Sequence, residues 1–222
     1  MFQHFAFFNS KSFLIMRYTG PKFKLCRREG VNLFGPAKYD VRKRRSVPGQ
    51  HWAGNVRYSE YGKLLRNKQL LKRLYQLSEK TFKTIVVKTS ARYAKNQNIK
   101  HDKSLLQFLE RRLDVIVLRA WFANTIMQSR QIVVHWHFLL NGKKHNVPSY
   151  FVNVWDVVSL RKKLTTSPLY AQCPLSSWGH SAPNWLKVNA KSFELEVSDL
   201  PAVDEMQVPA DVLKVVEFYA RA

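Results

Sequence analysis

The stretch from Arg111 to Leu160, RRLDVIVLRAWFANTIMQSRQIVVHWHFLLNGKKHNVPSYFVNVWDVVSL, decides the fold because it changes from helical to strand periodicity within its own length. Apolar residues from Leu113 to Phe122 recur at three- and four-residue spacings, which predicts a helix ending near Asn124. Thr125 is a suitable cap for a second helix reaching about His135. The side chains expected to turn partly inward on this second helix are Ile126, Gln131, Val133 and Val134, with Arg130 on its outer face.

The strand period begins after the second helix. Phe138 to Leu140 is a short apolar strand, Asn141-Gly142 is typical of a tight hairpin turn, and Lys143 to Val147 predicts the returning strand. The order helix, loop, helix, hairpin and then PSY at Pro148 to Tyr150 resembles the RNA-binding domain of the ribosomal protein S4 family. The resemblance implies such a domain over residues 109–163. The same domain also occurs in pseudouridine synthases, a tyrosyl-tRNA synthetase and a heat-shock protein, so the flanking segments must decide between them.

Charge is distributed unevenly along the 222 residues. The chain has 37 Lys and Arg against 15 Asp and Glu, a net charge of +22, which favours a polyanionic partner such as nucleic acid. Residues 1–103 hold 24 of the basic and 5 of the acidic residues, whereas residues 164–222 hold 4 and 7. No apolar run is long enough to span a membrane. Cys26 and Cys173 suggest neither a disulfide framework nor a zinc site, and we expect no cofactor.

A basic arm and loop are predicted over residues 17–58. The string RYTGPKFKLCRREGVNLFG, from Arg17 to Gly35, contains residues that interrupt regular structure, so we expect an extended arm with one helical turn. It is similar to the N-terminal arm of the S4 family, as is PGQH at Pro48 to His51. In that family basic residues after PGQHG line the path where messenger RNA enters the small subunit, but here Trp52 replaces the glycine. The residues expected to bind ribosomal RNA (rRNA) in this segment are Arg17, Lys22, Lys24, Arg27, Arg28, Arg42, Arg44, Arg45, Gln50, His51 and Arg57.

A helical platform is predicted over residues 59–108. Leucines between Leu64 and Leu77 form apolar stripes, and Ser78-Glu79 can begin a following helix that buries Phe82, Ile85 and Val86. We expect a loop at 95–103 before the next helix. The cations on the outer side of the platform, expected to bind rRNA, are Arg66, Lys68, Lys72 and Arg73.

Within the RNA-binding domain, guanidinium and ammonium groups on exposed faces are suited to phosphate. The residues expected to contact rRNA there are Arg112, Arg119, Arg130, Gln131, His135, His137, Asn141 and Lys143. Family members usually have Lys or Arg where Trp136 stands. A stacking contact with a base is one interpretation of Trp136, and packing is the one we expect.

The end of the chain differs in composition. Residues 164–183 read as a linker, and residues 184–222 as a two-stranded ribbon followed by a helix that begins near Val212. The closing VEFYAR is similar to the family's closing string, which implies that both ribbon and helix return to the platform. We expect the helix to pack through Leu213, Val216 and Phe218. By resemblance, ribosomal protein S5 would face the acidic residues Glu194, Glu196, Asp199, Asp204 and Glu205, and S3 would be a further neighbour; a solvated acidic tail is the alternative.

The predicted fold is therefore α+β: a basic helical platform with an inserted RNA-binding domain of two helices and a small twisted sheet. The resemblance implies a structural, non-enzymatic protein of the small ribosomal subunit that binds a helical junction in the 5′ domain of the rRNA, takes part in subunit assembly and contributes to decoding accuracy.

Two other functions are compatible with the RNA-binding domain. One is a pseudouridine synthase-like enzyme with Asp114 as nucleophile, but no chain remains for a separate catalytic domain. The other is a free RNA-binding stress factor. His135, His137 and His145 lack a fourth ligand at useful spacing, so we expect no metal site.

Residues 1–16 bear on the compartment. The aromatic residues 1–16, taken as a terminal extension rather than an arginine-rich presequence, favour a mitochondrial ribosome over bacterial cytoplasm or plastid.

Overall fold

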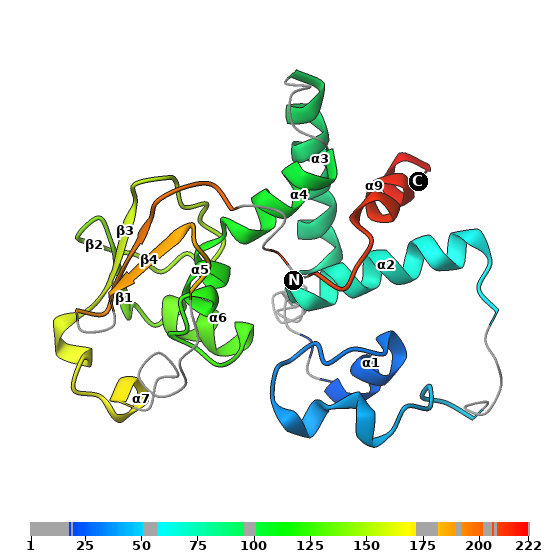
Figure 1. Ribbon diagram of the computed structural model, residues 1–222, viewed down its shortest axis with the longest axis horizontal. Coiled ribbons are helices and arrows are strands. Elements are labelled where there is room, and N and C mark those ends of the chain that lie inside the picture. Colours follow the sequence, from blue (N-terminus) through cyan, green and yellow to red (C-terminus); the bar gives the residue numbers. More distant parts are fainter. Residues whose placement is uncertain are drawn as a thin grey trace, which may run out of the picture.

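The computed structural model describes residues 18, 20–50, 57–95, 101–171, 182–189, 192–201, 206 and 208–221. The elements are arranged as an N-terminal arm, a helical platform and a mixed domain of helices and sheet (Figure 1). In chain order they are α1 (Lys22–Glu29), the short 3₁₀ helices η2 (Ala37–Tyr39) and η3 (Val41–Lys43), α2 (Glu60–Leu74), α3 (Glu79–Lys95), α4 (His101–Glu110), α5 (Leu113–Arg119), α6 (Ile126–Val134), β1 (Phe138–Leu140), β2 (Lys143–Lys144), β3 (Val157–Leu160), η4 (Lys162–Leu164), α7 (Pro168–Ala171), β4 (Leu186–Asn189), β5 (Glu194–Val197) and α9 (Val212–Arg221).

The platform consists of α2, α3, α4 and α9. Its first two helices begin at serines that accept hydrogen bonds from backbone N–H groups: Ser59 Oγ from Gly62 at 3.2 Å and Ser78 Oγ from Thr81 at 3.2 Å. The predicted interior residues Phe82, Ile85 and Val86 are buried. The predicted loop at 95–103 is shorter than expected, because α3 continues to Lys95 and α4 already begins at His101.

The mixed domain, which is named the RNA-binding domain after the family domain that its sequence resembles, has α5 and α6 packed on one face of an antiparallel sheet with strand order β2-β1-β3-β5-β4 (Figure 1). The predicted hairpin turn is confirmed: Asn141 (φ 49°) and Gly142 (φ 78°) both have the positive φ that a type I′ turn requires. The first helix ends five residues before the predicted Asn124, at Arg119. Trp121 adopts φ 61°, and Phe122 N–H donates to Val117 O at 3.2 Å, which closes the helix end.

The C-terminal ribbon does not return to the platform as expected. β5 pairs with β3 through Val157↔Glu196 and Val158↔Leu195, so the ribbon extends the sheet of the RNA-binding domain. Only α9 returns. Leu195 and Val197 point into the same core as α5 and α6, which explains why this apolar strand joins that sheet.

The predicted contact face of α9 is partly wrong. Leu213 is 63% exposed, whereas Val212, Val215 and Phe218 are buried against the platform and Val216 is partly buried. Aromatic contacts fix the orientation: Phe218 lies 5.6 Å from Tyr61 of α2 and Tyr219 lies 6.0 Å from Phe82 of α3, measured between ring centroids. The helix is therefore rotated relative to the expectation.

The arm is more regular than expected, because α1 has two full turns and the arm has a core of its own. Cys26, Leu33, Phe34 and Val41 are buried together with Leu70 of α2. The arm lies below α2 in the view of Figure 1. Leu70 thereby joins the core of the arm to the platform.

Gly35 allows the arm to approach the RNA-binding domain closely. Its φ is +89°, and a Cβ atom at this position would lie 3.3 Å from the backbone oxygen of Asn124, in the loop between α5 and α6. Both the backbone angle and this contact favour glycine. Val115 of α5 and Ile126 of α6 also lie in the platform core, so both helices are fixed to the platform by shared packing.

Candidate nucleic-acid interface

Several cations expected to bind rRNA instead hold carboxylates inside the protein. Glu29, at the end of α1, has an almost fully buried side chain and accepts a hydrogen bond from Arg66 at 3.3 Å and one from Arg73. Burial raises the pKa of Glu29, although Arg73 and Arg66 act in the opposite direction. Burial likewise lowers the pKa of Arg73. These two arginines therefore attach the arm to α2, and this pairing occupies guanidinium groups that were predicted to face RNA.

Lys68 and Lys72 form a second internal group around Glu79 of α3. Lys68 Nζ lies 2.7 Å from Glu79 Oε1, Lys72 Nζ lies 2.8 Å from Oε2, and Tyr219 OH donates to Oε1 at 2.8 Å. Burial raises the pKa of Glu79, but the hydrogen bonds from Lys68, Lys72 and Tyr219 outweigh it and lower the pKa to about 2. Lys68 is only 6% exposed, with Nζ 4.7 Å from the Phe218 ring centroid, so its expected outer position is wrong.

Contrary to what was expected of the predicted RNA contacts, Arg112 does not lie on an exposed face. It is 1% exposed and donates from Nε to Asp114 Oδ1 at 3.0 Å and from a terminal nitrogen to Oδ2 at 2.7 Å. The bidentate pair satisfies both carboxylate oxygens, which a buried charge requires. Asp114 is buried as well, so the whole ion pair lies inside the domain.

Arg119 belongs to a network that joins the platform to the RNA-binding domain. It donates two hydrogen bonds to the buried Glu110, at 2.9 and 2.7 Å, and Tyr75 OH donates to the same carboxylate at 2.6 Å. The hydrogen bond to Glu110 raises the pKa of Arg119, and burial raises the pKa of Tyr75 well above its ordinary value. Arg119 is therefore committed to an internal contact.

Other predicted residues support the local fold. Arg27 Nε donates to Ser46 O at 2.8 Å, which holds the loop that follows the RKRR run against α1. Lys22 Nζ lies 5.7 Å from the Phe34 ring centroid. Asn141 bridges the hairpin to Asp156 and to Val157 N–H, at 2.8 and 2.9 Å. Arg42 remains exposed but is paired with Asp40, whose pKa is lowered by the hydrogen bond from Arg42.

Apart from Arg130, the remaining predicted cations that the structure describes are exposed. Among the described residues, Lys24, Arg44, Arg45, Arg57 and Lys143 make no ion pair, and Arg28 makes a hydrogen bond of 3.4 Å to Pro48 O. Gln50 and Gln131 are exposed too, so the inward position expected for Gln131 is wrong. Arg130 is partly buried and reaches Gln76 O at 3.5 Å. Arg17 and His51 lie outside the described residues.

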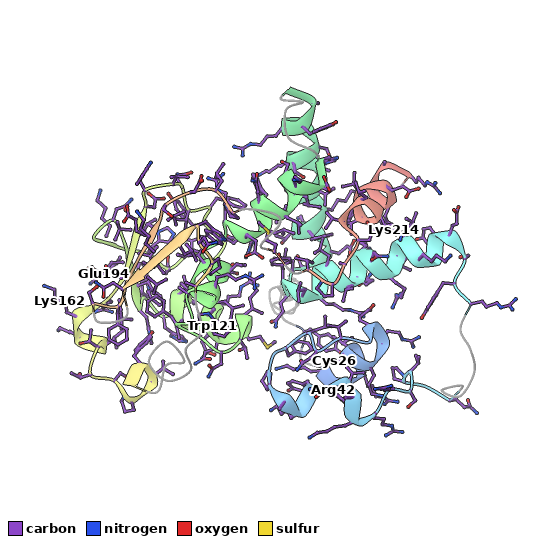
Figure 2. All side chains as sticks on the ribbon, in the orientation of Figure 1. Cys26, Arg42, Trp121, Lys162, Glu194 and Lys214 are labelled. Carbon is purple, nitrogen blue, oxygen red and sulfur yellow. The ribbon has the colours of Figure 1, made fainter. Side chains whose placement is uncertain are left out.

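A basic corner lies where α6 meets the sheet, and sequence reasoning found only part of it. His135 is exposed, and His137 Nδ1 lies 2.7 Å from Tyr170 OH. Burial lowers the pKa of His137, and the neighbouring His135 and Arg161 lower it further. Arg161 and the exposed Lys162 and Lys163 complete this corner (Lys162 is labelled in Figure 2). They were missed, although the RKK run directly after β3 was a visible signal; Lys144, next to Lys143, was missed in the same way.

The acidic residues predicted to face a protein lie mainly on the outer side of the ribbon. Glu194 and Glu196 help to line a groove of about 340 Å³ with Val157, Lys187 and Asn189. Asp199 is exposed, whereas Asp204 and Glu205 lie outside the described residues. In the part of the chain that the structure describes, no group of three His, Cys, Asp or Glu side chains is placed to hold a metal ion. No helix within those ranges has the length and apolarity to cross a membrane.

Comparison with known proteins covers nearly the whole chain. Residues 17–110 match the family model described as the ribosomal protein S4/S9 N-terminal domain, and residues 111–158 match the S4 domain model. The chain is 39% identical over 213 residues to the small ribosomal subunit protein uS4 of Petrotoga mobilis, covering 92% of this chain and 99% of that protein. Proteins of the same name from Methylobacillus flagellatus and Persephonella marina are 40% and 41% identical, with 92% of this chain and 98% of each relative covered.

Proposed function

Because this chain belongs to the ribosomal protein S4 family, we propose that it is a structural constituent of the small ribosomal subunit and binds its rRNA. The family is non-enzymatic. The observation that carries the proposal is the division among the cations: those at Glu29, Glu79, Glu110 and Asp114 are paired internally, whereas a second set faces solvent. The exposed set is Lys24, Arg28, Lys43, Arg44 and Arg45 in the arm, Arg57 before α2, Lys143 and Lys144 in the hairpin, and Lys162 and Lys163 after β3.

Exposed guanidinium and ammonium groups are suited to phosphate because they can exchange water for charge-assisted hydrogen bonds at low cost. Internally paired groups would first have to break an existing ion pair. We therefore assign rRNA contact to the exposed set, and we infer a helical junction in the 5′ domain as its target from the family resemblance. Subunit assembly, contact with messenger RNA and an influence on decoding accuracy belong to the same proposal.

The structure disfavours the pseudouridine synthase alternative. A catalytic aspartate must reach its substrate, but both Asp114 carboxylate oxygens accept hydrogen bonds from Arg112 and the side chain is buried. Ser129 Oγ also donates to the Asp114 backbone oxygen, so α6 packs directly against this part of α5. Asp114 is therefore assigned a structural role.

We also propose that a basic protein neighbour, ribosomal protein S5 or S3 by resemblance, faces Glu194, Glu196 and Asp199. These carboxylates lie in the acidic C-terminal part of a chain whose net charge is +22, so a basic partner is favoured over rRNA. For the compartment we retain the mitochondrial ribosome, based on the aromatic residues 1–16; organelle fractionation that placed the protein elsewhere would refute it.

The test compares charge removal at different places. Arg44→Ala with Arg45→Ala, and separately Lys143→Ala with Lys144→Ala, should each weaken binding of the full chain to a 5′-domain rRNA fragment. The matched control, Lys187→Ala with Lys214→Ala, removes the same charge from β4 and α9 and should weaken binding less. Equal losses in all three variants would show that only net charge matters, and unchanged binding in the first two would refute the assigned surface.

A further inference from the structure

Trp136 stands at a backbone position that favours glycine. It follows α6 with φ 61°, Trp136 N–H donates to Val133 O at 3.0 Å, and His137 N–H donates to Ile132 O at 3.2 Å. This pair of hydrogen bonds is the Schellman helix end, whose left-handed residue is usually glycine. A large side chain is strained there because its Cβ crowds the backbone. The structure thus tolerates a cost at Trp136 that glycine would avoid.

Packing does not account for Trp136. The side chain is 43% exposed, and it belongs to none of the hydrophobic clusters formed by the described residues. Our expectation that it packs is therefore not supported. An exposed indole in a strained position suggests that its ring is used in a contact outside the chain.

The segments that adjoin Trp136 carry several cations. A terminal nitrogen of Arg161 donates to Trp136 O at 3.3 Å, and Arg161 N–H donates to His137 O at 3.0 Å, so the turn after β3 lies against this helix end. Residues 126–140 and 161–171 contain Arg130, Lys162 and Lys163 besides Arg161, and they contain no Asp or Glu. β5, with Glu194 and Glu196, is separated from β1 by β3. An aromatic face among cations fits a nucleotide, which offers a base to stack and a phosphate to pair.

We propose that Trp136 is a stacking platform for an unpaired RNA base, with Arg161, Lys162 and Lys163 contacting the adjoining phosphates. The inference rests on the proposed function and adds a recognition element to it. It implies that the corner at α6 and η4 prefers single-stranded or bulged RNA to continuous duplex, because bases inside a duplex do not expose a face for stacking.

Trp155 provides a matched control. It also has positive φ, 72°, and is 68% exposed. Its surroundings are acidic, however: Asp156 follows it, and its N–H donates to Val197 O at 2.8 Å, next to Glu196. Phosphate would be repelled there. The two tryptophans therefore share strain and exposure but differ in the charge around them.

The experiment measures thermal unfolding and RNA affinity for Trp136→Gly and Trp155→Gly, using a 5′-domain rRNA fragment and a duplex of equal length. Glycine should raise the melting temperature of both variants, because it relieves a strained backbone. Trp136→Gly should weaken binding to the fragment roughly 5- to 150-fold, the range of one lost base stack, with the dependence on salt unchanged. Trp155→Gly should bind as wild type, and Trp136→Phe should recover part of the affinity.

Each other outcome refutes something specific. If Trp136→Gly binds the fragment with wild-type affinity, the stacking inference is overturned and the proposed function is unaffected. A lower melting temperature in Trp136→Gly would have the same consequence, because it would show that the side chain is needed for packing. An equal loss of affinity in both glycine variants, or loss of a protein partner with RNA binding intact, would also overturn the stacking inference. If the wild-type chain prefers neither RNA and binds both weakly, the proposed function fails and this inference fails with it.

Discussion

Arg112 and Asp114 form an ion pair in a part of the core that solvent does not reach. Replacing Arg112 with Ala leaves the carboxylate buried without its partner, so we expect the free energy of unfolding to fall by about 3–5 kcal/mol. Replacing both residues together, by Arg112→Met and Asp114→Leu, should recover most of that loss because no charge remains buried. Urea denaturation measures both variants. Wild-type stability in Arg112→Ala would contradict the internal role.

Glu79 gives the protein a dependence on pH. Its folded pKa of about 2 lies below the usual 4.5, so its hydrogen bonds contribute stability above pH 4.5 that is lost as the pH falls toward 2. The Glu79 side chain is about half exposed, so solvent screens its ion pairs and their contribution to the free energy of unfolding is small. Glu79→Gln should lower the free energy of unfolding by about 1 kcal/mol at pH 7. The difference from wild type should shrink between pH 4.5 and 2; a constant difference would contradict the assignment.

Which cations face solvent could not be predicted from the residues alone. Arg73 and Arg44 both lie among other cations in the sequence, so the sequence does not distinguish them. In the structure, Arg73 donates a hydrogen bond to Glu29, which lies 44 residues away along the chain. Such pairs depend on how α1 packs on α2, which local periodicity does not encode. That the chain has a basic surface was predictable from composition; which cations form that surface was not.

At the scale of elements, α9 shows that periodicity can predict a helix without determining which of its faces is buried. Apolar residues stand at 212, 213, 215, 216, 218 and 219, so more than one stripe is compatible with the sequence. Contact with α2, α3 and α4 selects the stripe containing Val212 and Val215 and leaves Leu213 exposed. The helix α2 was predicted from its leucine stripes, and α3, α6 and the hairpin turn were predicted because Ser78, Thr125 and Asn-Gly mark them locally.

A pair of substitutions tests the face of α9. Val215→Ala removes fully buried methyl groups and should lower the free energy of unfolding by about 2 kcal/mol. Leu213→Ala removes an exposed side chain and should change it by less than about 0.5 kcal/mol. Thermal unfolding of the two variants compares them. A larger loss in Leu213→Ala would mean that the helix is turned the other way.

At the scale of the whole molecule, carboxylates join parts that are distant in sequence. Glu29 attaches the arm to α2, and Glu110 attaches Tyr75 of the platform to Arg119 of the RNA-binding domain. The exposed cations are therefore carried on one connected body. The C-terminal ribbon, which resemblance placed on the platform, joins the sheet because β3 offers it a strand partner, a long-range pairing that periodicity cannot specify.

The net charge of +22 should make RNA binding strongly dependent on salt. If about 6–10 phosphates are contacted, affinity for the rRNA fragment should fall roughly 10³- to 10⁵-fold between 50 and 200 mM salt. Arg44→Ala with Arg45→Ala should reduce the slope of log affinity against log salt by about 1 to 2, because two phosphate contacts are lost. Filter binding over a salt series measures the slope, and a slope near zero would exclude this mode of binding.

Sedimentation of the tagged full chain from cell extract tests the central claim most directly. A structural constituent of the small subunit should move through a sucrose gradient with intact small subunits and with whole ribosomes, in constant ratio to their rRNA. The variant that combines Arg44→Ala, Arg45→Ala, Lys143→Ala and Lys144→Ala should shift toward the top of the gradient while remaining folded. A wild-type chain found free, or bound only to loose RNA fragments, would contradict the account.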